Sequence, residues 1–430
     1  MKPLISLETC FKLLEYIYPL FFLVCFFEFY LGLWGISTAI KFLSILICLL
    51  FSMPIIRKAS KNSYGFHKSF TVLYIYIVFS GIMYVVNEVP FKCYINELYN
   101  LIPAMFFVYV GMADRSNSRG FYDKFLIACT ICMTIGLFLY VSTPQWFVNR
   151  RVEIANSAWF NTMNQSENYV MQTLRFSSYL IDSYETDMYT IIGLSIALFS
   201  YYSGLVKRNI IGIAFILINF LAAVLTQQRV AMAASAAMLL FYIFWGVFKK
   251  GKAQSSKLVL VIFLSVIVAG TLVMTKFGDR AEQITELLND RSENMSASSA
   301  FSERTNQFEN AMSNWTMPIF GHGAGAGGAV AGAHGLPHVN DGGWVEFLFE
   351  YGIVGSLIFV VFLLSTIRRG LKYLRYYMTE LGIIAFVLVA MLGSNTLTLG
   401  YMIIVPFWYS IGRIWNRSNY EYIVANEIKI

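Results

Sequence analysis

The sequence predicts an all-α polytopic membrane protein with about twelve transmembrane helices and two large, partly helical loops outside the membrane. Three observations predict this fold class. The 430 residues are 57% apolar and only 13% charged, which is too little charge to cover a water-soluble domain of this length. Apolar runs of about 20 residues, the length that crosses the hydrocarbon core, recur along the chain. Short basic clusters alternate with them, as cytoplasmic loops require.

Twelve apolar runs qualify as spans, and each must be a helix because backbone polar groups cannot stay unpaired in lipid. The first has no small-residue cleavage site after it, so we expect a retained span and not a signal peptide. The runs lie near residues 13–34, 37–56, 70–86, 98–112, 125–143, 187–205, 210–226, 230–247, 258–275, 344–365, 380–394 and 399–415.

The basic clusters predict the orientation. They follow every even-numbered run, which places those loops and both termini in the cytoplasm. We therefore expect residues 1–430 to form a single transmembrane domain, with 144–186 and 276–343 as its first and second large outer loops. Loops of this length usually carry function. The clusters include Arg57, Lys58, Arg115, Lys207, Arg208, Lys249, Arg368, Arg369, Lys372 and Arg413.

Composition also excludes some classes of function. The net charge of +7 suggests nucleic-acid binding, but no basic stripe interleaved with aromatic residues is present, so we expect no nucleic-acid partner. Neither large loop contains cysteine, and His322, His334 and His338 match no zinc spacing. We therefore expect neither a metal nor a cofactor.

One candidate arginine lies in the first outer loop, and a second lies in a tight turn outside both large loops. Arg175 opens a stretch of hydroxyl-bearing residues, among them Tyr179, that precedes the sixth span and offers groups for sugar binding. A snorkelling interfacial arginine is the alternative. Arg229 lies in the tight turn between spans seven and eight, where a charge costs a few kcal/mol unless it faces a polar cavity or a partner. A structural carboxylate or carbonyl partner is the alternative there.

The second outer loop carries the third arginine and a glycine run. Arg304 shares the apolar face of a predicted helix with Phe301 and Phe308, so it needs a buried anionic partner. In the run that follows, Gly321 and Gly323 let backbone amides approach an anion closely. A flexible linker is the alternative reading of this run.

The second outer loop ends on a polar stretch that leads into span ten. Asn340 and Asp341 can cap that helix, which explains them structurally, and His338 precedes them. Glu346 and Glu350 are four residues apart and share one face within the span. Carboxylates inside a span need partners, and we expect the outer-face arginines to supply them.

Taken together, these residues resemble the bacterial O-antigen polymerase (Wzy) family, within the O-antigen polymerase and ligase superfamily. The resemblance covers nearly the whole chain. In the ligases of this superfamily a histidine stands at a fixed spacing before a glycine motif. Counting back from Gly352 with that spacing reaches Asp341 and not a histidine, which favours a polymerase. His338, three residues earlier, leaves the ligase open as an alternative. The motifs that carry the resemblance to the superfamily are Arg175-Phe176-Ser177-Ser178, Thr226-Gln227-Gln228-Arg229, Phe301-Ser302-Glu303-Arg304 and Phe320-Gly321-His322-Gly323.

The resemblance implies an inner-membrane glycosyltransferase of lipopolysaccharide or related polysaccharide biosynthesis, with its active face in the periplasm. Its substrates would be undecaprenyl-pyrophosphate-linked glycans, and its partners membrane lipid and a chain-length regulator protein. Without a metal, arginines would stabilise the pyrophosphate leaving group while a base takes the acceptor proton. The implied catalytic residues are Arg175, Arg229, Arg304, Asp341 and His338, and the implied substrate-binding residues are Gly321, Gly323, Asn340, Glu346 and Tyr179.

Two alternatives remain. An O-antigen ligase would transfer the glycan to a core lipid. A flippase for lipid-linked oligosaccharides also has about twelve spans, but it would have short loops and a cation-lined central cavity, so the 276–343 loop argues against it.

Overall fold

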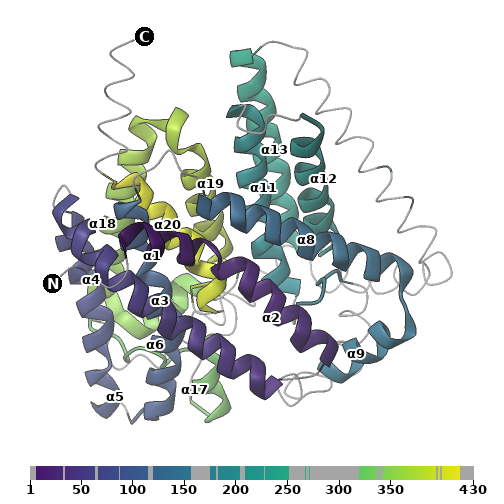
Figure 1. The fold of residues 1–430 in the computed structure, drawn as a ribbon. Coiled ribbons are helices and arrows are strands. Elements are labelled where there is room, and N and C mark those ends of the chain that lie inside the picture. Colours follow the sequence, from purple (N-terminus) through teal and green to yellow (C-terminus); the bar gives the residue numbers. More distant parts are fainter. Residues whose placement is uncertain are drawn as a thin grey trace, which may run out of the picture. The chain divides into compact units, whose positions relative to one another are not determined.

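In the computed structural model every regular element of the described residues is an α-helix (Figure 1). The chain divides into two compact units: unit 1 comprises residues 1–11, 48–118 and 284–430, and unit 2 comprises residues 12–47 and 119–283. The structure describes residues 6–31, 34–62, 66–86, 88–114, 120–155, 175–180, 183–203, 209–226, 228–250, 267, 271, 319–336, 339, 342–393, 396–397 and 400–416.

Each predicted span that falls within the described residues is helical. The ninth run, near 258–275, lies outside them apart from residues 267 and 271. The helices that match predicted spans are α1 (Leu7–Glu15), α2 (Ile17–Leu31), α3 (Trp34–Asn62), α4 (Phe66–Ser80), α5 (Ile82–Val86), α6 (Phe91–Met105), α7 (Phe107–Ala113), α8 (Gly120–Ser142), α11 (Ser183–Ser203), α12 (Asn209–Leu225), α13 (Arg229–Lys250), α18 (Gly343–Lys372), α19 (Leu374–Ala390) and α20 (Tyr401–Ile414).

Three of the described helical stretches are long and apolar enough to cross a membrane: Leu7–Leu31, Gly120–Ser142 and Gly343–Lys372. Several shorter apolar helices accompany them. Two further helices, α9 (Gln145–Ala155) and α17 (Ala329–Ala333), lie in the two predicted outer loops. Both loops are therefore partly helical. The helix expected around Phe301 and Phe308 lies outside the described residues.

The third predicted span is divided at Gly81, between α4 and α5. A Cβ at this position would lie 2.2 Å from the ring of Tyr94, so glycine makes room for that ring. The Tyr94 hydroxyl then donates to the Val78 carbonyl at 2.7 Å, an acceptor that also receives a longer bond of 3.4 Å from the Gly81 amide.

The core of unit 1 forms where α7 packs closely on α20. A Cβ at Gly111 would lie 2.3 Å from the Tyr409 carbonyl oxygen, so only glycine permits this approach. Arg413 donates to Asp114 Oδ2 at 3.0 Å and to Glu380 Oε1 at 2.9 Å, which ties α19 and α20 to the end of α7. Arg413 is thus a buried core residue with two carboxylate partners, and not a loop cation.

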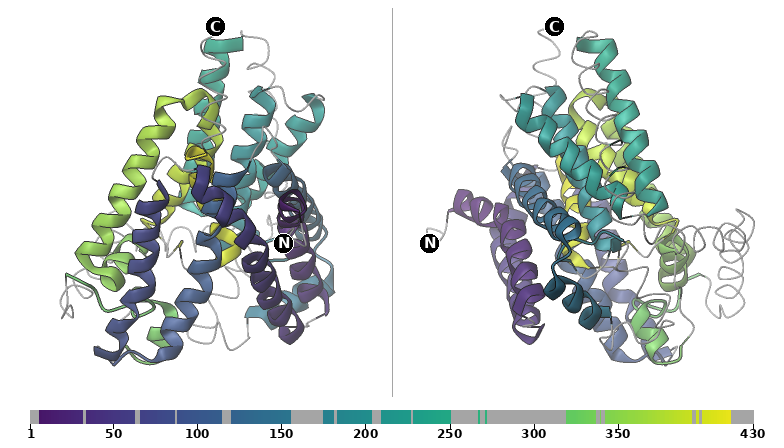
Figure 2. Two further views of the ribbon diagram at one scale, coloured as in Figure 1. Left: turned by 60° about the vertical axis from the view of Figure 1, so that its left-hand side comes forward. Right: turned by 90° about the vertical axis from the view of Figure 1, so that its right-hand side faces the viewer.

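Unit 2 packs α8 and α11 to α13 together with α2, and α11, α12 and α13 run side by side (Figures 1 and 2). Its centre is aromatic: the Tyr18 and Phe125 rings lie 4.6 Å apart, and those of Phe22 and Tyr189 5.0 Å apart. Asn219 of α12 donates to Thr130 Oγ1 of α8 at 3.0 Å, so a buried polar contact fixes these helices in register.

Candidate functional site

In unit 2, the short segment of residues 175–180 is fixed to three helices by hydrogen bonds. The Phe176 amide donates to the carbonyl of Leu225 at 3.0 Å, at the end of α12. Thr186 of α11 donates to the carbonyl of Ser177 at 2.8 Å, and the hydroxyl of Ser178 donates to the carbonyl of Cys132 in α8 at 2.8 Å. The 175–180 segment therefore has one defined position on this unit.

Arg151 of α9 holds the other side of the same segment. This buried guanidinium donates to the Leu180 carbonyl at 2.8 Å and to the Ser178 carbonyl. It also stands 5.4 Å from the centre of the Phe29 ring, a cation–π contact. A Cβ at Gly136 of α8 would lie 2.2 Å from Ser178 Oγ, so this glycine opens the space that the segment occupies. Arg151 is therefore a buried structural residue that holds the 175–180 segment in place.

Arg175 begins this fixed segment. Its Nε atom is buried and has no hydrogen-bond partner among the described residues. Because a guanidinium N–H without an acceptor is costly inside a protein, the position calls for an acceptor from outside the described part of the chain. An oxygen of an anionic ligand would serve.

The backbone of Arg175 lies beside the turn between α12 and α13. The Phe176–Leu225 bond joins the two segments, and Arg229 is the first residue of α13. The side chain of Arg229 lies outside the described part of the structure. Two of the three predicted arginines therefore belong to neighbouring backbone segments of one unit.

Buried polar groups surround the same turn. Thr226 Oγ1 lies 3.3 Å from Asp187 Oδ1, and Gln228 Nε2 donates to Ser183 Oγ at 3.1 Å. Asp187 is 5% exposed and sits in the first turns of α11. Asp187 was not among the predicted site residues, although a carboxylate at the head of an apolar span is a signal that could have identified it.

The predicted sugar-binding Tyr179 is a core residue of this unit. Its side chain is 4% exposed, and its ring packs edge to face on Phe26 with 5.3 Å between centroids. Burial raises the pKa of the Tyr179 hydroxyl, and the nearby Cys132 thiol raises it further, so the hydroxyl stays protonated. The exposed aromatic pair is instead Trp146 and Tyr30, whose rings lie 4.8 Å apart.

In unit 1, the glycine run packs on a kink within α18. Gly352 has a φ of +63° and Gly321 one of +80°, both in the left-handed region. A Cβ on Gly321 would lie 2.5 Å from the Gly352 nitrogen, and a Cβ on Gly352 would lie 2.5 Å from the Gly321 nitrogen. The Val354 amide then donates to the Ile319 carbonyl at 3.1 Å. Two facing glycines therefore allow the chain to cross the kinked helix at backbone contact.

Amides of the glycine run donate to α18. The His322 amide bonds to the Phe349 carbonyl at 3.0 Å, the Gly323 amide to the Glu350 carbonyl at 2.9 Å, and the Gly327 amide to Glu350 Oε1 at 3.0 Å. The buried imidazole of His322 also stacks on the ring of Phe349, with centroids 4.1 Å apart. Residues 321–328 are consequently an ordered segment, which we call the glycine clamp. The acceptor of its Gly327 amide is the carboxyl group of Glu350.

Three carboxylates are buried beside this clamp. Glu346 is 3% exposed and Glu350 1% exposed, both in α18, and Glu97 of α6 is 3% exposed. Glu97 is close enough to the other two to be repelled by their charge. Glu350 accepts a hydrogen bond from the Gly327 amide, and the Gly325 amide and the Tyr351 hydroxyl also lie within hydrogen-bonding reach of its carboxyl group. Glu97 was not predicted to belong to this cluster, because it lies in another helix far away in sequence.

Four predicted site residues, Arg304, His338, Asn340 and Asp341, lie outside the described residues. The described residues around the last three are fixed, however. The Val339 amide donates to the Gly327 carbonyl at 2.9 Å, and Gly342 is buried at the start of α18. The approach to span ten is thereby anchored to the glycine clamp.

Comparison with known proteins adds one finding. Residues 213–360 match the family model described as O-Antigen ligase, a family of glycan-transferring membrane enzymes. Arg175 precedes the matched stretch. The predicted site residues within it include Arg229, Arg304, Gly321, Gly323 and Asp341. No curated protein matches the chain.

Proposed function

We propose that this chain, which carries an O-antigen ligase family domain at residues 213–360, polymerises undecaprenyl-pyrophosphate-linked oligosaccharide repeat units. The product would be O-antigen or a related surface polysaccharide. The observation that carries the proposal is the family match over the loop and span that contain Asp341, where the ligase pattern has a histidine. The reaction belongs at the periplasmic face of the inner membrane, where both lipid-linked substrates are presented.

The reaction we propose is a glycosyl transfer between two lipid-linked glycans. The anomeric carbon of the growing chain loses its bond to the undecaprenyl pyrophosphate oxygen, and the electron pair leaves with the pyrophosphate. A hydroxyl at the non-reducing end of a new repeat unit forms the replacement bond and gives its proton to a base. No redox step or co-reactant is needed. The chemistry therefore requires cations for the leaving group and a base for the acceptor.

Arginine is suited to the leaving group because its guanidinium stays charged and binds phosphate oxygens in pairs. The buried Nε of Arg175, in the fixed 175–180 segment, has no acceptor among the residues that the structure describes, and this supports the role. We assign the same role to Arg229, at the start of α13, and to Arg304 in the second outer loop. Fixed arginines would stabilise developing charge without reorganisation during the reaction.

For the base we propose Asp341, with His338 as the alternative. Both precede α18 in a stretch whose described neighbours, Val339 and Gly342, are anchored. Glu346 and the clamp glycines then act by holding the head of α18 in position, in contrast to the direct contact with substrate predicted for them. The anchoring supports a base with a defined place, as general base catalysis requires.

The membrane arrangement is part of the proposal. We propose twelve spans, with both termini cytoplasmic and the loops at 144–186 and 276–343 periplasmic. The described helices and the basic clusters after even-numbered runs support this arrangement.

An O-antigen ligase is the second candidate, favoured by the match to the O-Antigen ligase family model and by His338. A deletion strain separates the two functions. Loss of a polymerase leaves lipopolysaccharide that carries a single repeat unit, whereas loss of a ligase leaves bare core lipid. We expect the single-repeat pattern, and bare core would contradict the polymerase. A flippase would instead move lipid-linked repeats across a bilayer without lengthening them.

A further inference from the structure

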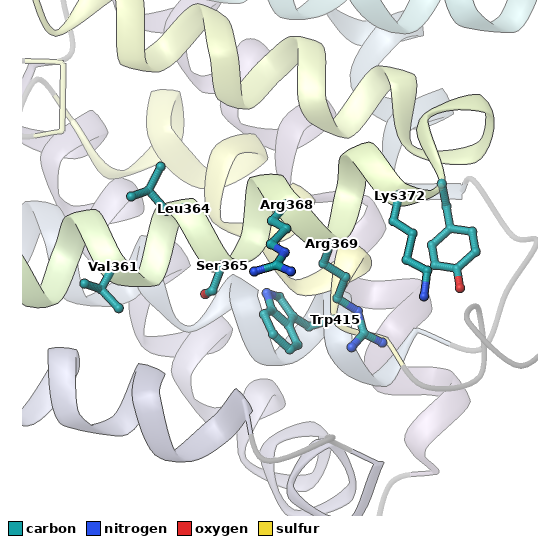
Figure 3. Close-up of a pocket in the computed structure, with 8 residues that line it drawn as sticks. Val361, Leu364, Ser365, Arg368, Arg369, Lys372 and Trp415 are labelled. Atoms are coloured by element: carbon teal, nitrogen blue, oxygen red, sulfur yellow. The ribbon is translucent and has the colours of Figure 1, made fainter.

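A separate cavity of about 690 Å³ lies at the C-terminal end of α18 in unit 1 (Figure 3). One side of it is cationic, with Arg368, Arg369 and Lys372 from the last turns of the helix. The described residues that line it include no acidic side chain. The cavity is thus electropositive.

Arg369 is pre-ordered for binding. Its Nε donates to the Ile414 carbonyl at 3.0 Å, and its guanidinium stands 4.7 Å from the centre of the Trp415 ring. The Trp415 indole in turn donates to Thr366 Oγ1 at 2.9 Å. In Figure 3 the side chains of Arg368 and Arg369 extend to the same side of α18 as this indole. A fixed cation over an aromatic floor loses little side-chain entropy when it binds an anion.

The opposite side of the cavity is apolar and open. Val361 is 64% exposed and Leu364 60% exposed, about two turns and one turn respectively before Arg368 on the same helix. These residues belong to a helix that is long and apolar enough to cross a membrane, in which lipid chains would lie against such exposed apolar side chains. The cavity therefore meets the cations at one end and the hydrocarbon at the other, as an amphiphile with an anionic head would require.

We propose that this cavity binds the phosphate headgroup of an anionic phospholipid. Arg368, Arg369 and Lys372 contact the phosphate, and the acyl chains run along Val361 and Leu364. The site is independent of the proposed transfer chemistry, since none of its residues takes part in it. A free phosphate ion shares the headgroup chemistry but leaves the apolar side uncovered.

The test is native mass spectrometry of the full chain released from nanodiscs. One set of nanodiscs contains phosphatidylcholine alone, and a second contains phosphatidylcholine with phosphatidylglycerol. The variant carries both Arg368→Gln and Lys372→Gln, two exposed residues that form no ion pair with another described residue. Lys68→Gln, an exposed cation at the start of α4 outside the cavity, is the matched control. Arg369 is left intact because it supports Trp415.

We expect a retained phosphatidylglycerol adduct on the wild type and on Lys68→Gln. The double variant should bind it about 30-fold more weakly, because each basic residue near an anionic headgroup contributes on the order of 1 kcal/mol. If the double variant does not fold, Arg368→Gln alone should weaken binding about fivefold. Equal adducts on wild type and variants would overturn the site. In phosphatidylcholine nanodiscs, inorganic phosphate that binds the wild type but not the double variant would overturn the lipid assignment.

Discussion

The position of Arg175 is set by its neighbours in the 175–180 segment, which are hydrogen-bonded to the surrounding helices. Hydrogen bonds from the adjacent residues hold the backbone on α8, α11 and α12, while the Nε atom itself has no acceptor among the described residues. Desolvation without an acceptor is unfavourable for folding, and we assign the missing acceptor to a bound ligand.

Replacement of Arg175 tests this role. Arg175→Ala should lower polymer yield by about 100-fold or more, the size of effect seen when a donor to developing charge is removed. Arg175→Lys should recover only part of it, because lysine lacks the planar fork that grips two oxygens. Polymer length and amount on gels of lipopolysaccharide give the measurement. Arg150→Lys is the control, since Arg150 pairs with Glu153 and with the Phe29 carbonyl. Full activity in Arg175→Lys would contradict bidentate binding.

Arg151 should behave differently from Arg175, to which we assign a catalytic role. Arg151→Met would leave the Ser178 and Leu180 carbonyls without these donors, at a cost of about 1–3 kcal/mol for each buried group left unpaired. We expect a lower Tm for the detergent-purified protein, together with reduced activity as the 175–180 segment loosens. An unchanged Tm would show that Arg151 does not hold the segment.

Among the elements, α18 joins the most features in unit 1. Its N-terminal part carries Glu346 and Glu350, its kink at Gly352 receives the glycine clamp, and its C-terminal turns form the basic cavity. The clamp replaces helix hydrogen bonds that the kink opens, as with the Val354 amide and the Ile319 carbonyl. The kink is therefore stabilised by the loop that precedes the helix in sequence.

Glycine substitutions separate strain from close packing at this kink. Gly352→Ala adds a Cβ that would lie 2.5 Å from the Gly321 nitrogen, in addition to the strain of a positive φ. Gly335→Ala is the matched control, because its φ is +73° but nothing lies within 4 Å of the added atom. Strain alone costs about 1–2 kcal/mol, so the control should lower Tm modestly. Gly352→Ala should lower folded yield and Tm clearly further. Equal losses would mean that backbone contact is unimportant.

The helices themselves could be predicted from sequence because lipid leaves backbone polar groups no alternative. Breaks within spans could not be predicted, because the break at Gly81 depends on the ring of Tyr94, from α6, which packs there. Arg175 could be singled out because cations are rare on the predicted outer face. Asp187 and Glu97 were missed because their relevance depends on which helices pack together. The glycine run could be flagged, but its partner carboxylate on α18 could not.

On the scale of the whole molecule, the alternation of basic clusters predicts the topology. Within the described residues the native cysteines Cys10, Cys25, Cys93, Cys129 and Cys132 are buried, so the background for cysteine labelling should be low. A cysteine at Ser298 should react with a membrane-impermeant maleimide added to intact cells with a permeable outer membrane. A cysteine at Ser418 should react only after the inner membrane is opened. Labelling of both in intact cells would contradict the proposed orientation.

The most direct test of the central claim is reconstitution of the purified full chain in proteoliposomes with undecaprenyl-pyrophosphate-linked repeat units as the only glycan. The proposed function predicts a ladder of lipid-linked products longer than one repeat, formed by the wild type and lost in Arg175→Ala, while Arg150→Lys retains it. Core lipid added as a competing acceptor should not divert the chains. Repeat units that stay single, or that move across the bilayer without growth, would contradict it.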